Sequence, residues 1–170
     1  MKKFLPVLLL AFVSLFIFSC DNSDDNVVGD GNTYSKVRDV NVNLNSSNSY
    51  GHIEPLNINN TDVVLVYRRD VAQGNGWQLI PKTYYLSGGR ELDYNFLFSS
   101  QQVEIYTDGV DPSTLSSAEA STYLNGQTFR IVLVPASAAK GTSTVDTSDY
   151  NAVIKYYGLD DSKVPVTKAK

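Results

Sequence analysis

Segment 91–98 alternates polar and apolar side chains, and this alternation is the strongest constraint that the sequence places on the fold. Its apolar positions are Leu92, Tyr94, Phe96 and Phe98, and its polar positions are Glu91, Asp93 and Asn95. Successive side chains of a strand point to opposite faces, so a strand here has one buried side and one side toward water. The pattern therefore predicts an antiparallel sheet with one face packed on a core.

A tight turn is predicted directly before this strand. Gly88-Gly89 suits a two-residue hairpin loop, because a primed turn needs positive φ at both of its central residues. Pairing outward from this loop sets Tyr85 opposite Leu92. It also sets Tyr84 opposite Asp93, so the sequence predicts that Tyr84 lies on the solvent-facing side of the sheet.

Further strands follow from short apolar runs between turn signals. They are predicted at 37–44, 62–68, 77–86 and 127–134, and Ser99-Ser100 predicts a turn into one more strand that sets Phe96 opposite Val103. Pro81 interrupts the 77–86 run, which predicts a bulge or a sheet edge there. With 11 tyrosines and 7 phenylalanines, the composition favours strands. We therefore expect a mostly β chain, with residues 34–146 forming an antiparallel β-sandwich of six or seven strands.

The C-terminal region changes its period. The apolar residues spaced as one helix stripe are Tyr150, Val153, Ile154 and Tyr157. Together with a capping residue before them and Gly158 after them, they predict one amphipathic α-helix over residues 147–160. Residues 161–170 are predicted to be a frayed tail. In the 111–126 segment, Ser116 and Glu119 have capping-box spacing, which leaves one or two helical turns or a long loop as alternatives.

The N-terminus has the layout of a secretory signal, with Lys2 and Lys3 before an apolar run at 4–18. This run is shorter than the roughly 20 residues that a membrane-spanning helix needs. An uncleaved anchor is the alternative. We predict a signal peptide over residues 1–19, followed by Cys20, which is the sole cysteine of the chain.

The residues around this cysteine, Ile17-Phe18-Ser19-Cys20, resemble the lipobox of bacterial lipoprotein signals. The resemblance implies cleavage before Cys20 and a lipid thioether on its sulfur. The membrane is therefore the first expected partner, and the protein would contact it through the lipid on Cys20. Two or three acyl chains anchor a protein stably where a single chain is marginal.

Residues 20–33 are small, polar and acidic, which predicts a flexible tether. Within it, Ser23, Asp24 and Asp25 are similar to the acidic surface-export signals that follow the cysteine in Bacteroidetes-type lipoproteins. This similarity implies an outer-membrane lipoprotein displayed on the cell surface. The alternatives are a plain spacer and a domain that faces the periplasm.

The domain has a family resemblance of its own. Its successive motifs are Val-Val-Leu-Val-Tyr at 63–67, Thr-Tyr-Tyr-Leu-Ser-Gly-Gly at 83–89 and Phe-Arg-Ile-Val-Leu-Val-Pro at 129–135. They resemble the small β-domain lipoproteins of Bacteroidetes-type bacteria, over residues 34–160. Some of those relatives carry collagen-like glycine repeats, which this chain lacks. The resemblance implies no activity.

No catalytic pattern is visible in the sequence. His52 is the only histidine and lies in a loop-like stretch, and Cys20 is used by the anchor. There is no nucleophile elbow, phosphate loop, dinucleotide fingerprint or zinc spacing. The net charge of −4 argues against a nucleic-acid partner. We therefore expect a protein that is not an enzyme and that uses no cofactor and no metal.

One face of the predicted sheet is a candidate binding surface. Its members are Tyr84, Asp93, Glu104, Tyr106 and Asp108. Aromatic rings beside carboxylates suit a glycan or protein partner, whereas the plainer alternative is a solvated acidic face. The expected function is that of a binding or structural module. A small glycan hydrolase that uses two of the carboxylates is the alternative.

Overall fold

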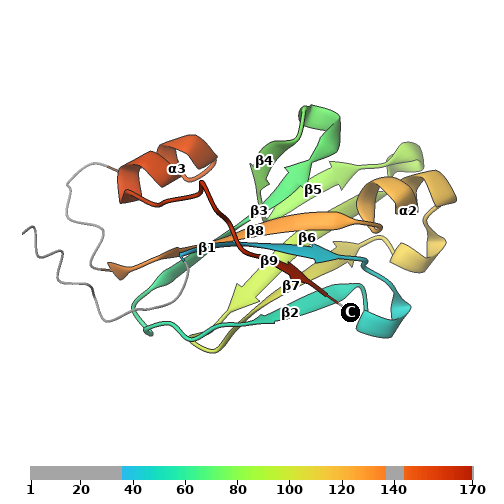
Figure 1. Cartoon of the computed structure of the whole chain (residues 1–170). Coiled ribbons are helices and arrows are strands. Elements are labelled where there is room, and N and C mark those ends of the chain that lie inside the picture. The colour runs from blue at the N-terminus through green and yellow to red at the C-terminus, as the bar shows by residue number, and fades with distance from the viewer. Residues whose placement is uncertain (1–35, 137–143, 170) are drawn as a thin grey trace, which may run out of the picture. The chain divides into compact units, whose positions relative to one another are not determined.

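Strands dominate the part of the chain that this computed structural model describes, residues 36–136 and 144–169, all within the compact unit Thr33–Lys170 (Figure 1). The five-stranded sheet consists, in order, of β4 (Gly76–Leu79), β3 (Val63–Asp70), β8 (Gln127–Val134), β1 (Val37–Val42) and β9 (Val166–Lys168). The four-stranded sheet consists of β2 (Gly51–Pro55), β7 (Gln102–Gly109), β6 (Glu91–Phe98) and β5 (Lys82–Tyr85). Two helices accompany them, α2 (Ser117–Tyr123) and α3 (Tyr150–Tyr157). All neighbouring strands are antiparallel except β1 and β9.

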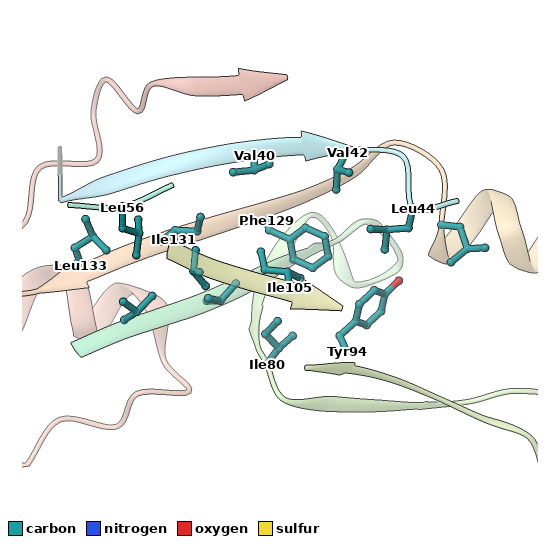
Figure 2. Packing of buried hydrophobic residues seen from close by; sticks show 14 of the residues in the cluster. Val40, Val42, Leu44, Leu56, Ile80, Tyr94, Ile105, Phe129, Ile131 and Leu133 are labelled. Carbon is teal, nitrogen blue, oxygen red and sulfur yellow. The ribbon is translucent and has the colours of Figure 1, made fainter. Parts of the chain in front are cut away.

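The main core lies between the two sheets. Figure 2 shows Val40, Phe129 and Ile131 from one sheet pointing toward Tyr94 and Ile105 from the other. All of these side chains are fully buried. Apolar faces of two sheets that bury each other define a sandwich. The predicted mostly β sandwich is therefore confirmed.

A second apolar cluster covers the opposite face of the five-stranded sheet. Tyr67 from β3 and Val132 from β8 pack there against Tyr150 and Val153 of α3. Alternate residues of β8 thus point into two different cores, which explains why its sequence reads as an almost continuous apolar run. The rings of Tyr67 and Tyr150 meet edge to face at 5.3 Å.

Arg130 fastens α3 to this face. Its Nε and Nη2 atoms donate to the two carboxylate oxygens of Asp39 at 2.7 and 2.9 Å, in a bidentate pair. Its Nη1 donates to the Tyr150 hydroxyl at 2.6 Å, and that hydroxyl donates to Asp161 at 2.6 Å. The guanidinium also lies 4.2 Å from the ring centre of Trp77. One side chain therefore joins β1, β4, β8 and the C-terminal segment.

The predicted strand over 77–86 is divided between the two sheets. The chain turns at the cis Ile80–Pro81 bond, with β4 in the five-stranded sheet before it and β5 in the four-stranded sheet after it. Ile80 is the last residue to donate to the first sheet, through its N–H to Val66 O at 3.0 Å. Proline has no N–H with which to continue a ladder, which explains the position of the change. The predicted sheet edge at Pro81 is confirmed, because β4 and β5 are each an edge strand, whereas the change from one sheet to the other was not predicted.

The register predicted around Gly88-Gly89 was wrong by one residue. Residues Ser87–Gly89 form a 3₁₀ turn, and Tyr84 lies opposite Leu92, with Tyr85 opposite Glu91. A shift of one residue exchanges the two faces of a strand, so Tyr84 points inward. The second hairpin differs from its prediction by two residues, with Phe96 opposite Ile105, and its faces are therefore unchanged.

The C-terminal helix has the predicted caps. Asp149 accepts from the Ala152 N–H, Gly158 adopts a left-handed conformation, and the Leu159 N–H donates to Ile154 O. The capping box of Ser116 and Glu119 is also present, and it begins α2. The segment predicted as a frayed tail instead contains β9, which pairs in parallel with β1. With this strand, β2 and the division at Pro81, the described residues form nine strands, more than the predicted six or seven.

We predict that Gly109→Ala destabilises the fold by about 3 kcal/mol and Gly88→Ala by about 1 kcal/mol. Both glycines have positive φ, 84° at Gly109 and 73° at Gly88. A Cβ on Gly109 would lie 2.6 Å from Glu91 O, whereas one on Gly88 meets nothing within 4 Å. Urea unfolding of the two variants measures the difference. Equal losses of stability would show that the contact with Glu91 is unimportant.

Candidate functional site

The outer face of the four-stranded sheet carries most of the predicted binding residues. Asp93 lies directly opposite Asp108, and Tyr106 and Glu104 follow on the same face of β7. These four residues therefore share one face of the sheet, and their role in binding stays a prediction. The face also has exposed apolar side chains, namely Tyr85, Leu97 and Ile53. Within the described residues, α3 packs on the other sheet, and α2 contacts β5 and β6 from inside the sandwich, through Tyr123.

A hollow of about 410 Å³ opens at the β2–β7 edge of this face. Tyr106, Glu104 and Ile53 contribute to it from the strands, and Asn48 and Ser49 contribute from the loop before β2. Its volume lies in the range of small-molecule sites. An aromatic ring beside a carboxylate, an amide and a hydroxyl provides both an apolar surface and hydrogen-bonding groups.

Two successive residues in the loop before β2 have unusual backbone angles. Ser49 and Tyr50 adopt positive φ values of 52° and 55°. Side chains other than glycine rarely adopt this conformation, which costs of the order of 1 kcal/mol for each residue. Three hydrogen bonds hold the loop, from the Tyr50 N–H to Asn45 O at 2.8 Å and from the Thr107 N–H and hydroxyl to Tyr50 O at 3.3 and 3.2 Å. Such strain is often found at functional sites.

His52 also borders the hollow, and it lies in β2 and not in a loop as predicted. Its Nε2 is 3.1 Å from a carboxylate oxygen of the buried Glu54. The other oxygen of Glu54 accepts from Arg38 Nη1 at 3.3 Å and from the Thr167 hydroxyl at 3.1 Å. The carboxylate thus connects β2 of one sheet to β1 and β9 of the other, which is a structural role.

The carboxylates on the outer face do not form a metal cage. The nearest acids across the strands are Asp93 and Asp108, and each is already held by a neighbour. Asp93 accepts from the Thr83 hydroxyl at 2.5 Å, and Asp108 accepts from the Gly109 N–H at 2.7 Å. In residues 36–136 and 144–169, no group of three or more His, Cys, Asp or Glu side chains is placed to hold a metal ion.

Tyr84 is the member of the predicted face that the structure places elsewhere. It lies inside the sandwich, where its ring meets those of Tyr94 and Tyr123 at 5.6 and 5.4 Å. The guanidinium of the buried Arg68 lies 4.9 Å from the ring centres of both Tyr84 and Tyr94. The prediction that Tyr84 faces solvent was wrong. Its ring instead packs against the buried guanidinium of Arg68.

Each of the three side-chain nitrogens of Arg68 has a hydrogen-bond partner. Its Nε donates to the Gln127 side chain at 2.8 Å, its Nη1 to the Tyr84 hydroxyl at 3.1 Å and its Nη2 to Thr122 O at 2.9 Å. Asp70 lies 3.8 Å from Nη1. Burial raises the pKa of Tyr84 and of Tyr94 above the usual tyrosine value, so both phenols remain protonated at neutral pH. A cation with these neighbours ties β3, β5, α2 and β8 together.

Sequence reasoning missed Arg68 and the loop before β2. The signal for Arg68 was present, because it continues the inward alternation of Val64 and Val66 in an apolar strand. The hollow had no comparable signal. Its loop residues read only as a turn, and their proximity to Tyr106 depends on the pairing of β2 with β7.

No family model, curated protein or solved structure matches this chain. Cys20, Ser23, Asp24 and Asp25 lie outside the described residues. Among the helices that the structure does describe, none is long and apolar enough to cross a membrane.

We predict that Arg68→Ala and Arg68→Lys each destabilise the protein by about 3 kcal/mol or more. The alanine leaves Gln127 and Asp70 without their cation, whereas the lysine keeps the charge but cannot reproduce the planar fork of donors. The neighbouring Arg69 is exposed, so Arg69→Ala is the matched control, with a change within about 0.5 kcal/mol. Chemical denaturation measures all three. Equal stabilities of the Arg68 and Arg69 variants would contradict a structural role for Arg68.

Proposed function

We propose that this protein is a membrane-anchored, non-catalytic binding module that contacts its ligand through the outer face of the four-stranded sheet. The hollow at the β2–β7 edge is the centre of that contact. The observation that carries the proposal is the position of Tyr106, which is half-buried beside Glu104 on a sheet face that the described helices leave uncovered.

The chemistry of the hollow favours a neutral glycan. A tyrosine ring offers an apolar surface for the C–H face of a sugar, while Glu104, Asn48 and Ser49 can hydrogen-bond its hydroxyl groups. Glu104, Asp93 and Asp108 give this face a negative charge, which disfavours acidic ligands. The loop of Ser49 and Tyr50 is held in its strained form before any ligand binds. Binding therefore costs little conformational entropy in this loop.

The membrane anchor is the second part of the proposal, and the sequence alone supports it. Cys20 follows a short apolar leader within a lipobox-like motif, and an acidic, polar stretch follows it. Lipid on Cys20 would hold the sandwich near an outer membrane, on a tether of 14 residues if it spans 20–33. Ser23, Asp24 and Asp25 support display on the cell surface.

The binding proposal predicts that Tyr106→Ala weakens glycan affinity by about tenfold, because it removes the stacking surface. The full-length protein in detergent is first tested against an array of neutral oligosaccharides, and hits are measured by calorimetry. Tyr85→Ala is the control, since Tyr85 shares the face but lies on the far edge strand, 78% exposed. Unchanged binding by Tyr106→Ala would reject this site. Cleavage of a bound glycan would favour the hydrolase alternative.

The anchor proposal predicts that labelled palmitate enters the wild-type protein in bacterial cells and does not enter Cys20→Ala. Only Cys20 offers a thiol for the lipid, because it is the sole cysteine of the chain. The measurement is autoradiography of the immunoprecipitated protein, with equal expression as the control. Label in the Cys20→Ala variant would contradict anchoring through Cys20. Protease treatment of intact cells tests surface display, which complete protection of the domain would reject.

A further inference from the structure

Arg69 differs from the other arginines in the part of the chain that the structure describes. The others each have a carboxylate within ion-pair distance, in the pairs Arg38–Glu54, Arg68–Asp70, Arg90–Glu119 and Arg130–Asp39. Within residues 36–136 and 144–169, the Arg69 side chain makes no hydrogen bond, ion pair or ring contact. Its positive charge is therefore uncompensated by any neighbour in that part of the protein.

Arg69 borders a hollow of about 370 Å³ where β3 ends, α2 ends and β8 begins. Arg68 lines the same hollow, and so do Ser121, Asn125 and Thr128. Among the lining residues in this described region, none is acidic. Two arginines, three residues with hydroxyl groups and two residues with side-chain amides thus line one space, and all of these side chains can donate hydrogen bonds.

The buried Arg68 has donors to spare. A guanidinium carries five N–H groups. Its hydrogen bonds to Gln127, Tyr84 and Thr122 use one each on Nε, Nη1 and Nη2. Those bonds also fix the orientation of the group, because they come from three separate elements. Arg68 therefore contributes a positive charge of fixed orientation beside the hollow. The exposed Arg69 contributes a second positive charge, whose side chain can change conformation.

The balance of charge at this hollow is opposite to that of the whole chain. The net charge of the chain is −4, and the outer face of the four-stranded sheet is acidic. Asp70 lines an adjoining hollow of about 160 Å³ beside Tyr84, and its carboxylate is 3.8 Å from Arg68. Asp70 therefore compensates Arg68 and leaves the charge of Arg69 for another anion.

We propose that this hollow binds a carboxylate-bearing ligand of about monosaccharide size. The planar fork of an arginine matches a carboxylate in two parallel hydrogen bonds, and Arg69 is free to form such a pair. Ser121, Asn125 and Thr128 would meet the polar groups on the rest of the ligand. The volume of about 370 Å³ suits a sugar acid or another small organic acid.

This site is independent of the proposed glycan-binding face. It adjoins the five-stranded sheet and α2, and its charge is of the opposite sign. A negative result for one site therefore does not contradict the proposal for the other site. Together they would allow the module to distinguish acidic from neutral ligands by which hollow each enters.

The test is a titration of the ¹⁵N-labelled full-length protein in detergent, followed by NMR, with glucuronate as the probe and glucose as its neutral counterpart. Glucuronate is expected to shift the signals of Arg69, Ser121 and Asn125, while glucose leaves them unchanged. Arg69→Gln is expected to weaken glucuronate binding at least about tenfold, as loss of a charge-assisted pair requires. Lys155→Gln removes the same charge from an exposed position of α3 and is expected to bind as the wild type does.

Three outcomes would overturn the proposal. The first is the absence of NMR shifts at about 20 mM glucuronate, a concentration that would detect even weak binding. The others are equal shifts with glucose and an unchanged glucuronate affinity in Arg69→Gln. Acetate distinguishes the source of the carboxylate. Competition by acetate at equal concentration supports a site for small carboxylates in general. Competition only at far higher concentration supports a site for a sugar acid. Stronger binding of sulfate than of glucuronate would overturn the carboxylate assignment.

Discussion

The structure depends on a strand that is buried on both of its faces. β8 lies at the centre of the five-stranded sheet, with Phe129 and Ile131 in the core between the sheets and Val132 in the cluster beneath α3. Two separate covers are therefore needed, because apolar side chains on either face would otherwise meet water. The four-stranded sheet provides one cover, and the C-terminal helix, fastened by Arg130, provides the other.

This arrangement determines where a partner can be met. Once α3 is used on the five-stranded sheet, the outer face of the four-stranded sheet is the one that the described helices leave accessible. The hydrogen bonds from Gly126 to Asn43 and from Leu44 to Leu124 bring the loop before β2 to the same end of the sandwich as α2. Asn48 and Ser49 of one hollow and Asn125 and Gly126 of the other lie in the loops of this end, as expected when binding loops are carried by a rigid sheet scaffold.

Charged groups inside the sandwich hold its layers in position. Arg68 joins strands of both sheets to α2, and Glu54 connects β2 to β1 and β9. In the described residues, every buried side-chain nitrogen or oxygen has a hydrogen-bond partner. Burial of a charge is tolerated only with such complete pairing, and removal of one partner leaves the other unpaired at a cost of several kcal/mol. These groups therefore stabilise one relative arrangement of the sheets.

Most of the strands, the capping box of α2 and the caps of α3 could be predicted from the sequence alone, because alternation, helical period and capping act over only a few neighbouring residues. The tertiary structure decided that Tyr84 faces inward, since a turn one residue longer than predicted exchanges the faces of a strand. It also decided the change of sheet at Pro81 and the pairing of β9 with β1. Contacts between residues distant in sequence have no local pattern, and for the same reason both hollows were invisible before the fold was known.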